Sequence, residues 1–302
     1  MKRKSLIIFL CVFWSAVVQA QVATPSIDPA LPTELPSAGS WRFGSVIAAD
    51  TLFGERESDV EKVKLHPLGV SALVAWQPSQ VTVELYMAPE TLQDDVDSST
   101  DTFSESKQLK SYLSLSIRGE NRVSVGVTVR QLENKSTTKT TEKSFGGSVS
   151  VRVFGGLFIA AGLERVSSVR SGLDTLRWGK NLAGISLQLG DPFSKMLRLE
   201  ASLRTSPEVK ESTTSAIRHQ KTADMQIAAE ALFSGILLSY LNRSLVEGTG
   251  IGEVTVESQR IGAGYRGDNL TFMFYQYSGT ETIGEKSYNE KKYQATFSLS
   301  FM

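Results

Sequence analysis

The sequence predicts an all-β fold, a transmembrane antiparallel up-and-down β-barrel of about fourteen strands, with twelve as the alternative count. Three observations predict it. Segments that alternate apolar and polar residues recur along most of the 302 residues, the connections between them alternate short and long, and aromatic residues gather near the segment ends. Successive side chains of a strand point to opposite faces, so alternation gives each segment one apolar and one polar face. In a barrel the apolar faces meet lipid and the polar faces line the interior.

The N-terminus predicts export. A basic start at residues 2–4 precedes the apolar run 6–18, and Val18-Gln19-Ala20 fits a small-residue cleavage site. We therefore interpret residues 1–20 as a cleaved signal peptide. The run is too short for a comfortable membrane helix, and a retained anchor helix is the alternative.

The composition excludes several classes of protein. Cys11, the one cysteine, lies within the signal and would leave with it, which argues against a small disulfide-stapled secreted domain. Loss of the three basic residues at positions 2–4 leaves 29 basic against 32 acidic residues. No large basic surface follows, so nucleic acid is not expected as a partner.

Residues 21–40 are rich in proline, serine and alanine. Proline lacks the backbone N–H that a strand ladder needs. We expect a flexible periplasmic lead-in here, with a small plug folded into the barrel mouth as the alternative. The barrel domain is then predicted at residues 41–302.

The strand segments follow from alternation between turn signals. In order they are 41–49, 68–76, 81–87, 113–117, 123–129, 149–153, 157–163, 183–189, 197–203, 225–231, 236–240, 261–265, 270–274 and 293–301. The first and eleventh have the weakest pattern, because their second faces are also partly apolar.

The connections support the same fold. Short ones such as Gly155-Gly156 and Ser234-Gly235 alternate with long ones. The long connections are predicted at 89–108, 131–143, 165–180, 204–221, 244–255 and 279–290. Outer-membrane barrels have short periplasmic turns and longer extracellular loops, so both termini are expected in the periplasm.

Aromatic residues are placed where membrane interfaces should lie. The expected interface aromatics are Trp41, Trp76, Phe154, Phe193, Phe233, Tyr265 and Phe301 at the periplasmic side, and Trp178 and Tyr293 at the outer side.

With its signal peptide, strand and turn rhythm and C-terminal segment 293–301, the chain resembles bacterial outer-membrane β-barrel proteins, including the porin-like ones. The resemblance covers residues 41–302. It implies an outer-membrane location, contact with outer-membrane lipid, and recognition of segment 293–301 by the barrel assembly machinery. Met302 departs from the pattern, because such segments usually end on the aromatic residue.

The predicted inner face carries small polar residues and charges. The candidate lumen-lining charges are Arg42, Glu84, Arg118, Arg130, Arg152, Glu164, Arg198, Glu200, Arg204, Asp224, Glu230 and Arg260. Their basic excess suggests a weak preference for anions. The alternative is that arginines and carboxylates pair across neighbouring strands and brace the wall.

Two other motifs give little support to a specific function. Arg266-Gly267-Asp268 matches an adhesion tripeptide but falls in a predicted periplasmic turn, where it is ordinary turn chemistry. The acidic stretch 89–108 begins like a calcium loop, yet Thr100 and Ser106 stand where glycine and glutamate are needed, so a solvated loop is expected.

Catalysis finds little support either. His66 and His219 are the two histidines, and no nucleophile motif or metal-ligand spacing accompanies them. We therefore expect no enzyme and no cofactor. The expected function is passive passage of small solutes through an outer-membrane channel. The alternatives are a closed structural or binding barrel that docks a periplasmic or surface partner and, third, a barrel hydrolase that uses His219.

Overall fold

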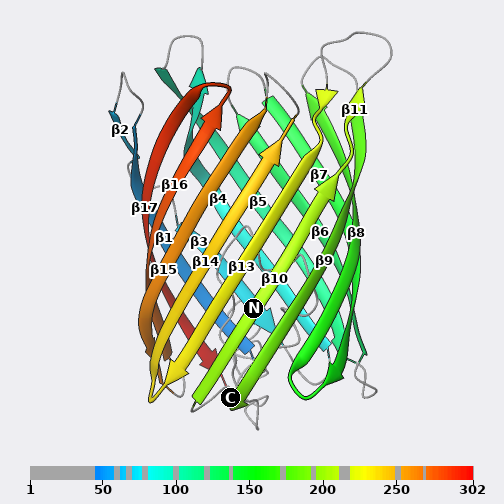
Figure 1. Ribbon diagram of the computed structural model, residues 1–302, viewed down its shortest axis with the longest axis vertical. Coiled ribbons are helices and arrows are strands. Elements are labelled where there is room, and N and C mark those ends of the chain that lie inside the picture. Colours follow the sequence, from blue (N-terminus) through cyan, green and yellow to red (C-terminus); the bar gives the residue numbers. More distant parts are fainter. Residues whose placement is uncertain are drawn as a thin grey trace, which may run out of the picture.

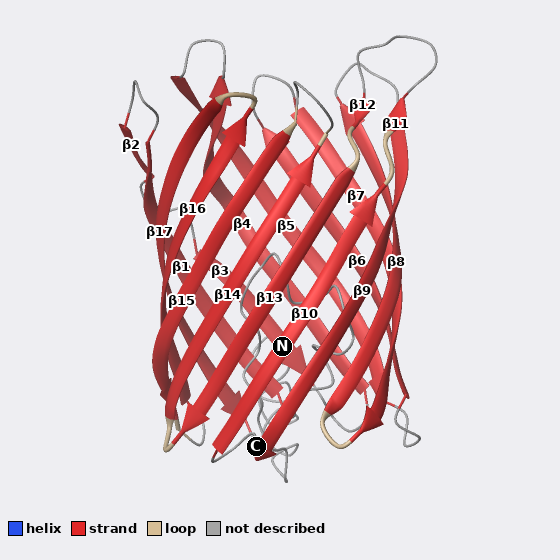
Figure 2. Ribbon diagram, in the orientation of Figure 1, coloured by secondary structure: helices blue, strands red, loops and turns tan. Residues whose placement is uncertain are grey.

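The computed structural model describes residues 45–57, 62–65, 70–76, 81–97, 102–118, 123–135, 139–170, 175–191, 195–210, 218–248, 253–267 and 270–301. Nearly all of these residues form strands (Figure 2). None of the described residues belongs to a helix long and apolar enough to cross a membrane. The fold within these ranges is therefore all-β.

Seventeen strands make up the described chain. The first nine are β1 (Ser45–Glu57), β2 (Lys62–Leu65), β3 (Val70–Trp76), β4 (Val81–Asp97), β5 (Thr102–Arg118), β6 (Val123–Lys135), β7 (Lys139–Phe154), β8 (Leu157–Arg170) and β9 (Thr175–Asp191). The others are β10 (Lys195–Ser206), β11 (Val209–Lys210), β12 (Arg218–His219), β13 (Thr222–Phe233), β14 (Ile236–Glu247), β15 (Val254–Arg266), β16 (Leu270–Ile283) and β17 (Lys286–Phe301).

The main sheet closes on itself. Strands that are adjacent in sequence pair antiparallel from β3 to β10 and from β13 to β17, and β10 pairs with β13. The ring is completed by β1, which pairs with β3 on one side and with β17 on the other, from Ser45↔Phe301 to Glu57↔Asn289. The result is an antiparallel up-and-down barrel of tilted strands (Figure 1), as the sequence predicts.

Two small additions lie at the upper end of the barrel as drawn in Figure 1. Strand β2 pairs with the end of β1, at Gly54–Glu57, and β11 pairs with β12 in a separate two-stranded sheet. The sequence did not predict these short strands, because segments of two to four residues are too short to show a period of two.

The lower end of the barrel carries tight turns. The β13–β14 turn is Ser234-Gly235, and both residues have positive φ, 49° and 83°. Two positive φ values define the two-residue hairpin turn that matches strand twist, and glycine adopts such a conformation without strain. This geometry confirms the prediction of a short connection at this position.

The long connections are shorter than predicted. Pairing continues to Asp97↔Thr102 between β4 and β5, and to Lys135↔Lys139 between β6 and β7. Between β16 and β17 it continues to Ile283↔Lys286, so Gly284-Glu285 forms a two-residue turn where 279–290 was predicted as a loop. The predicted loops 131–143, 165–180, 204–221 and 244–255 also contain strand residues.

The physical reason is that both faces of these strand ends are polar. The alternation that marks a strand in sequence disappears there, although the backbone ladder goes on. The acidic stretch 89–108 was likewise predicted as a loop. It lies largely in β4 and β5, and its residues 98–101 lie outside the described ranges.

Candidate functional site in the barrel interior

Exposure alternates along the strands and separates two faces of the wall. On β10, Leu197, Leu199 and Leu203 are exposed, whereas Met196 and Arg198 are buried. The same period of two runs along β13, β14 and β16. The outward face is thus rich in exposed large apolar residues, and charges of the predicted lumen set such as Arg198 and Asp224 share the inward face.

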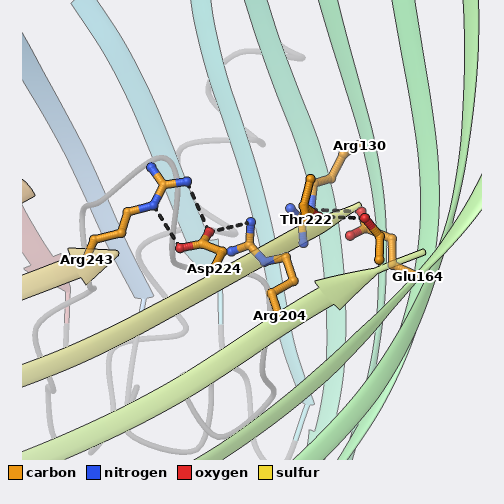
Figure 3. A network of polar contacts seen from close by, with 7 residues as sticks. Arg130, Glu164, Arg204, Thr222, Asp224 and Arg243 are labelled. Carbon is orange, nitrogen blue, oxygen red and sulfur yellow. Dashed lines mark hydrogen bonds and ion pairs between the residues drawn. The ribbon is translucent and has the colours of Figure 1, made fainter. Parts of the chain in front are cut away.

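An ion-pair network crosses the upper part of the interior. Arg243 Nε and Nη2 donate to the two carboxylate oxygens of Asp224 at 2.9 and 3.0 Å, and Arg204 Nη1 approaches Asp224 Oδ2 at 3.4 Å. Figure 3 shows the two arginines reaching Asp224 from either side. One carboxylate therefore ties together the three consecutive wall strands β10, β13 and β14.

A second pair lies further along the same wall. Arg130 Nε of β6 is 3.7 Å from Glu164 Oε1 of β8, so this contact spans the intervening strand β7 (Figure 3). Between the two ion-pair groups, the hydroxyls of Ser206 and Thr222 lie 2.5 Å apart. These contacts join neighbouring strands from the inside.

A separate charge group lies lower in the barrel. Arg198 Nη2 donates to Glu200 Oε2 at 2.9 Å, and its Nη1 donates to Glu230 Oε2 at 3.2 Å. All three side chains are at least four-fifths buried. Because a buried guanidinium needs both charge and hydrogen-bond compensation, two carboxylates around one arginine stabilise it in its charged form.

Arg260 lies among aromatic residues. Its guanidinium carbon is 4.6 Å from the ring centre of Tyr275 and 5.8 Å from that of Tyr277. Arg260 Nη1 also donates to the Tyr277 hydroxyl at 3.4 Å, and that hydroxyl donates to Gln294 Oε1 at 2.5 Å. A cation over aromatic rings is stabilised by the ring quadrupole.

An apolar cluster forms part of the same inner wall. Met196, Leu232, Leu237, Met273 and Tyr275 are each at most 6% exposed and pack together. The register explains the cluster, because Met196 is opposite Leu232, Leu232 is opposite Leu237, and Gly264 stands between Leu237 and Met273. The interior therefore combines charged groups with a continuous apolar arc.

Trp178 differs from expectation. Its place in the sequence predicts an outer interface aromatic, but its side chain is 8% exposed and packs with Val166 and Leu176. Val209 of the β11–β12 hairpin packs against this cluster. The expectation was wrong because Trp178 shares the parity of the inward residues of β9, whereas the exposed residues Ile185 and Leu189 have the opposite parity.

The other expected aromatics divide into two groups. Phe154, Phe233 and Tyr265 are exposed at the lower ends of their strands, and the Tyr293 ring stacks on Phe274 at 6.1 Å. Trp41 and Phe193 lie outside the described residues, as do the side chains of Trp76 and Phe301. Their assignment to membrane interfaces stays a prediction.

The predicted lumen charges can be placed in part. Arg130, Glu164, Arg198, Glu200, Arg204, Asp224, Glu230 and Arg260 lie on the inner wall in the contacts given above. Arg152 is exposed beside the Gly155 turn, with its Nε donating to the Gly155 carbonyl and its guanidinium near the Phe158 ring. Arg42 and the side chains of Glu84 and Arg118 are outside the described residues.

Sequence reasoning missed several interior residues. Gln226, Arg266, Met273, Tyr275 and Gln294 are all buried on the inner wall. The parity of each strand would have found them, since each is adjacent to an outward apolar residue, as Gln226 is to Met225 and Tyr275 is to Phe274. Gln226, Met273, Tyr275 and Gln294 were passed over because they are neither small nor charged, and Arg266 because it was assigned to a turn.

Among the described residues, no group of three or more histidine, cysteine, aspartate or glutamate side chains is arranged to hold a metal ion. Several interior polar atoms within these ranges, such as Ser186 Oγ and Gln226 Oε1, are buried without a hydrogen-bond partner. The interior thus offers polar groups and an apolar arc to a guest, and the fold defines a closed antiparallel barrel with an apolar exterior.

Comparisons with known proteins support this class. No protein-family model and no curated protein sequence matches the chain. Among solved structures, it is similar to the CymD monoaromatic hydrocarbon channel, with a TM-score of 0.62, 9% identity and coverage of 94% of this chain and 95% of that one. A Pseudomonas aeruginosa FadL homologue matches with a TM-score of 0.54, 7% identity and coverage of 95% and 99%.

The Pseudomonas putida toluene transporter TodX also matches, with a TM-score of 0.52, 9% identity and coverage of 95% of this chain and 97% of that one. At such identities the likeness shows the fold alone. The chain therefore has the fold of outer-membrane β-barrel channels.

Proposed function

We propose that this protein is an outer-membrane channel for the passive passage of small solutes. The observation that carries the proposal is the closed barrel, in which β1 pairs with β17, apolar residues point outward and charges point inward. Closure pairs the backbone hydrogen-bonding groups at the edges of β1 and β17, and a wall within lipid requires such pairing. The protein would act through the shape and charge of its interior, with no cofactor and no enzymatic step.

The finer architecture follows from the same proposal. The wall has fourteen membrane-spanning strands, which are the strands of the main sheet other than the short β2, and both termini are periplasmic. Residues 1–20 are removed on export, and residues 21–40 form a periplasmic lead-in or a small plug. Segment 293–301, which contains most of β17, is the part recognised by the assembly machinery.

The interior favours solutes with an apolar or aromatic part. The arc formed by Met196, Leu232, Leu237 and Met273 offers an apolar surface, and Tyr275 joins it to Arg260. The names of two similar structures, a monoaromatic hydrocarbon channel and a toluene transporter, agree with this solute class. Burial of apolar area contributes roughly 25 cal/mol per Å², so even a small aromatic guest gains from such a surface.

The anion preference is the weaker part of the proposal. Arg130, Arg198, Arg204 and Arg243 each contact a carboxylate. Paired charges on neighbouring strands support the bracing interpretation, because their fields largely cancel in the lumen. Charge reversal at Arg130 and Arg198 that leaves ion selectivity unchanged would remove the anion preference.

A closed binding barrel is the second candidate, and one observation favours it. Leu232, Leu237, Tyr288 and Gln294 are each 1% exposed although they lie on the inner face. An open water-filled lumen would leave such side chains in contact with solvent. A barrel of this kind would serve to dock a partner. The hydrolase alternative stays untested, because His66 and the side chain of His219 lie outside the described residues.

The deciding experiment is single-channel recording of the refolded mature protein in a planar bilayer, together with uptake of toluene into vesicles that contain it. Stable current steps with toluene uptake are the expected result. Toluene uptake without conductance would indicate a narrow apolar path. The absence of both, in a barrel whose gel mobility shifts on heating as for a folded one, would favour the closed alternative.

A further inference from the structure

The outer wall carries a polar recess of about 530 Å³ on strands β14 to β17 and the end of β1. Its size falls within the range of small-molecule sites, roughly 300–1,000 Å³. It is lined by a first row of side chains, Asn242, Gln259, Ser278 and Lys291, which face one another across the ladder. Among the residues of the interior ion-pair network described above, the recess shares Arg243.

The recess faces outward, away from the lumen. Asn242 has the parity of the exposed Tyr240, and Gln259 has the parity of the exposed Ile261. The inward neighbours Leu241, Arg260 and Tyr288 do not line it. The lining also includes Arg243, Ser258, Gly279 and Glu290, a row of inward parity that lies between the two outward rows. Arg243 directs its guanidinium to Asp224 inside the barrel (Figure 3). The floor of the recess is therefore the strand ladder.

The recess begins where the apolar outer surface ends. One row below it, Tyr240 is opposite Ile261, Ile261 is opposite Gln276, and Gln276 is opposite Tyr293. Side chains two residues further along a strand tilted at about 40° lie about 5 Å higher along the barrel axis. The polar headgroup layer of a bilayer is roughly 5–7 Å thick on each side. A ladder row is perpendicular to the tilted strands, so it rises by about 3 Å from each strand to the next and crosses the headgroup layer obliquely.

A second row extends the recess by another two residues. It contains Ser244, Glu257, Thr280 and Asn289, and Thr280 Oγ1 donates to Asn289 Oδ1 at 3.1 Å. That hydrogen bond uses one acceptor of the Asn289 amide, whose NH₂ group is a separate donor. The two rows thus offer hydroxyl and amide groups at neighbouring heights.

The charges of the lining indicate which headgroup fits. Two outward carboxylates, Glu57 and Glu257, accompany one outward cation, Lys291. Without a basic excess, a headgroup recognised only through phosphate gains little here. Sugar hydroxyls can donate to carboxylates and accept from amide N–H groups, so they match the lining of the recess. The Lys291 ammonium can pair with one phosphate group of the same headgroup.

We propose that this recess binds the saccharide headgroup of an outer-leaflet glycolipid whose acyl chains lie on the apolar surface below. The inference depends on the proposed outer-membrane location. The occupant is argued from continuity between the recess and that apolar surface, and from the balance of hydroxyl, amide and carboxylate groups in the lining.

The test uses the refolded mature protein in detergent micelles, titrated with purified rough lipopolysaccharide and followed by native mass spectrometry. Replacement of Gln259 and Ser278 by leucine is expected to weaken lipopolysaccharide binding about tenfold, because several hydrogen bonds to sugar hydroxyls are lost. Asn181→Leu is the matched control, since Asn181 is an exposed amide on β9, outside the recess. This control should keep the affinity of the original protein.

Equal affinity in the double variant and the original protein would overturn the proposal, as would equal binding of phosphatidylglycerol, which lacks the sugars. Thr280→Leu is a second variant for the case in which the double variant does not fold. Competition by the deacylated headgroup separates sugar recognition from acyl-chain contact. A failure of the channel proposal shows separately, as a lack of conductance and toluene uptake by the original protein.

Discussion

Asp224 and Arg243 form a two-point ion pair between adjacent strands, with both guanidinium–carboxylate distances near 3 Å. The carboxylate of Asp224 is 4% exposed, and Arg204 approaches it from the other neighbouring strand. Three strands of the wall therefore share one buried negative charge. Removing that charge would leave two arginines without their common partner on the inner face.

We expect Asp224→Asn to lower the free energy of unfolding by about 2–3 kcal/mol, because it leaves the charges of two arginines uncompensated on the inner face. The partial exposure of Arg243 keeps this loss below that of a fully buried pair. Urea titration of the micelle-bound barrel, followed by tryptophan fluorescence, measures this. Lys292→Gln is the control. Its pair with Glu290 is about one-third exposed, so its removal should cost less than about 1 kcal/mol. Equal losses would contradict the bridging role of Asp224.

A second prediction concerns close packing between β15 and β16. A Cβ added to Gly264 would overlap the carbonyl oxygen of Phe272 and come within 2.5 Å of Met273 Sδ. Gly264→Ala should therefore destabilise the barrel by about 1–3 kcal/mol or reduce the folded fraction. Gly179→Ala should be tolerated, since the nearest atom to its added Cβ is 3.9 Å away. Heat-dependent gel mobility reports both folded fractions.

The Trp178 cluster predicts a spectroscopic result. In the mature protein, which lacks Trp14, with Trp41 and Trp76 replaced by phenylalanine, emission from Trp178 should be blue-shifted. It should also resist quenching by acrylamide, because Val166 and Leu176 cover the ring. Val209→Ser should increase quenching several-fold by weakening the cover from the β11–β12 hairpin. Strong quenching before the Val209 change would place the ring in solvent and contradict this packing.

The sequence predicted the outward and inward faces well where one face is apolar. Leu197 and Leu199 are exposed and Arg198 is buried, as their alternation indicates. It failed at strand ends such as β16–β17, where both faces are polar and the ladder leaves no periodic signal. The prediction for Trp178 was wrong because it used the position of the residue near a strand end and ignored which face its side chain is on.

The sequence could not predict which inner charges pair with one another, for a different reason. Asp224 is 20 residues from Arg204 and 19 from Arg243, and only the register brings Arg204 opposite Asp224. Register depends on turn geometry and on the fit of whole strands, which residue types alone do not specify. The list of inner charges could therefore be predicted in large part, but which of them meet could not.

Closure of the wall by β1 and β17 has a consequence for biogenesis. The two strands are paired over thirteen positions, from Ser45↔Phe301 to Glu57↔Asn289, and they stand at opposite ends of the described chain. The seam cannot form until β17 has been synthesised, so every earlier or partly folded form leaves the outer edges of two strands without hydrogen-bond partners. Such edges invite pairing with other chains. Formation of the seam is thus the step at which a chaperone bound to the nascent chain has the greatest effect. Circular permutation that moves the chain ends to the Ser234-Gly235 turn would place the last-formed strand pair, and its unpaired edges, at β13 and β14.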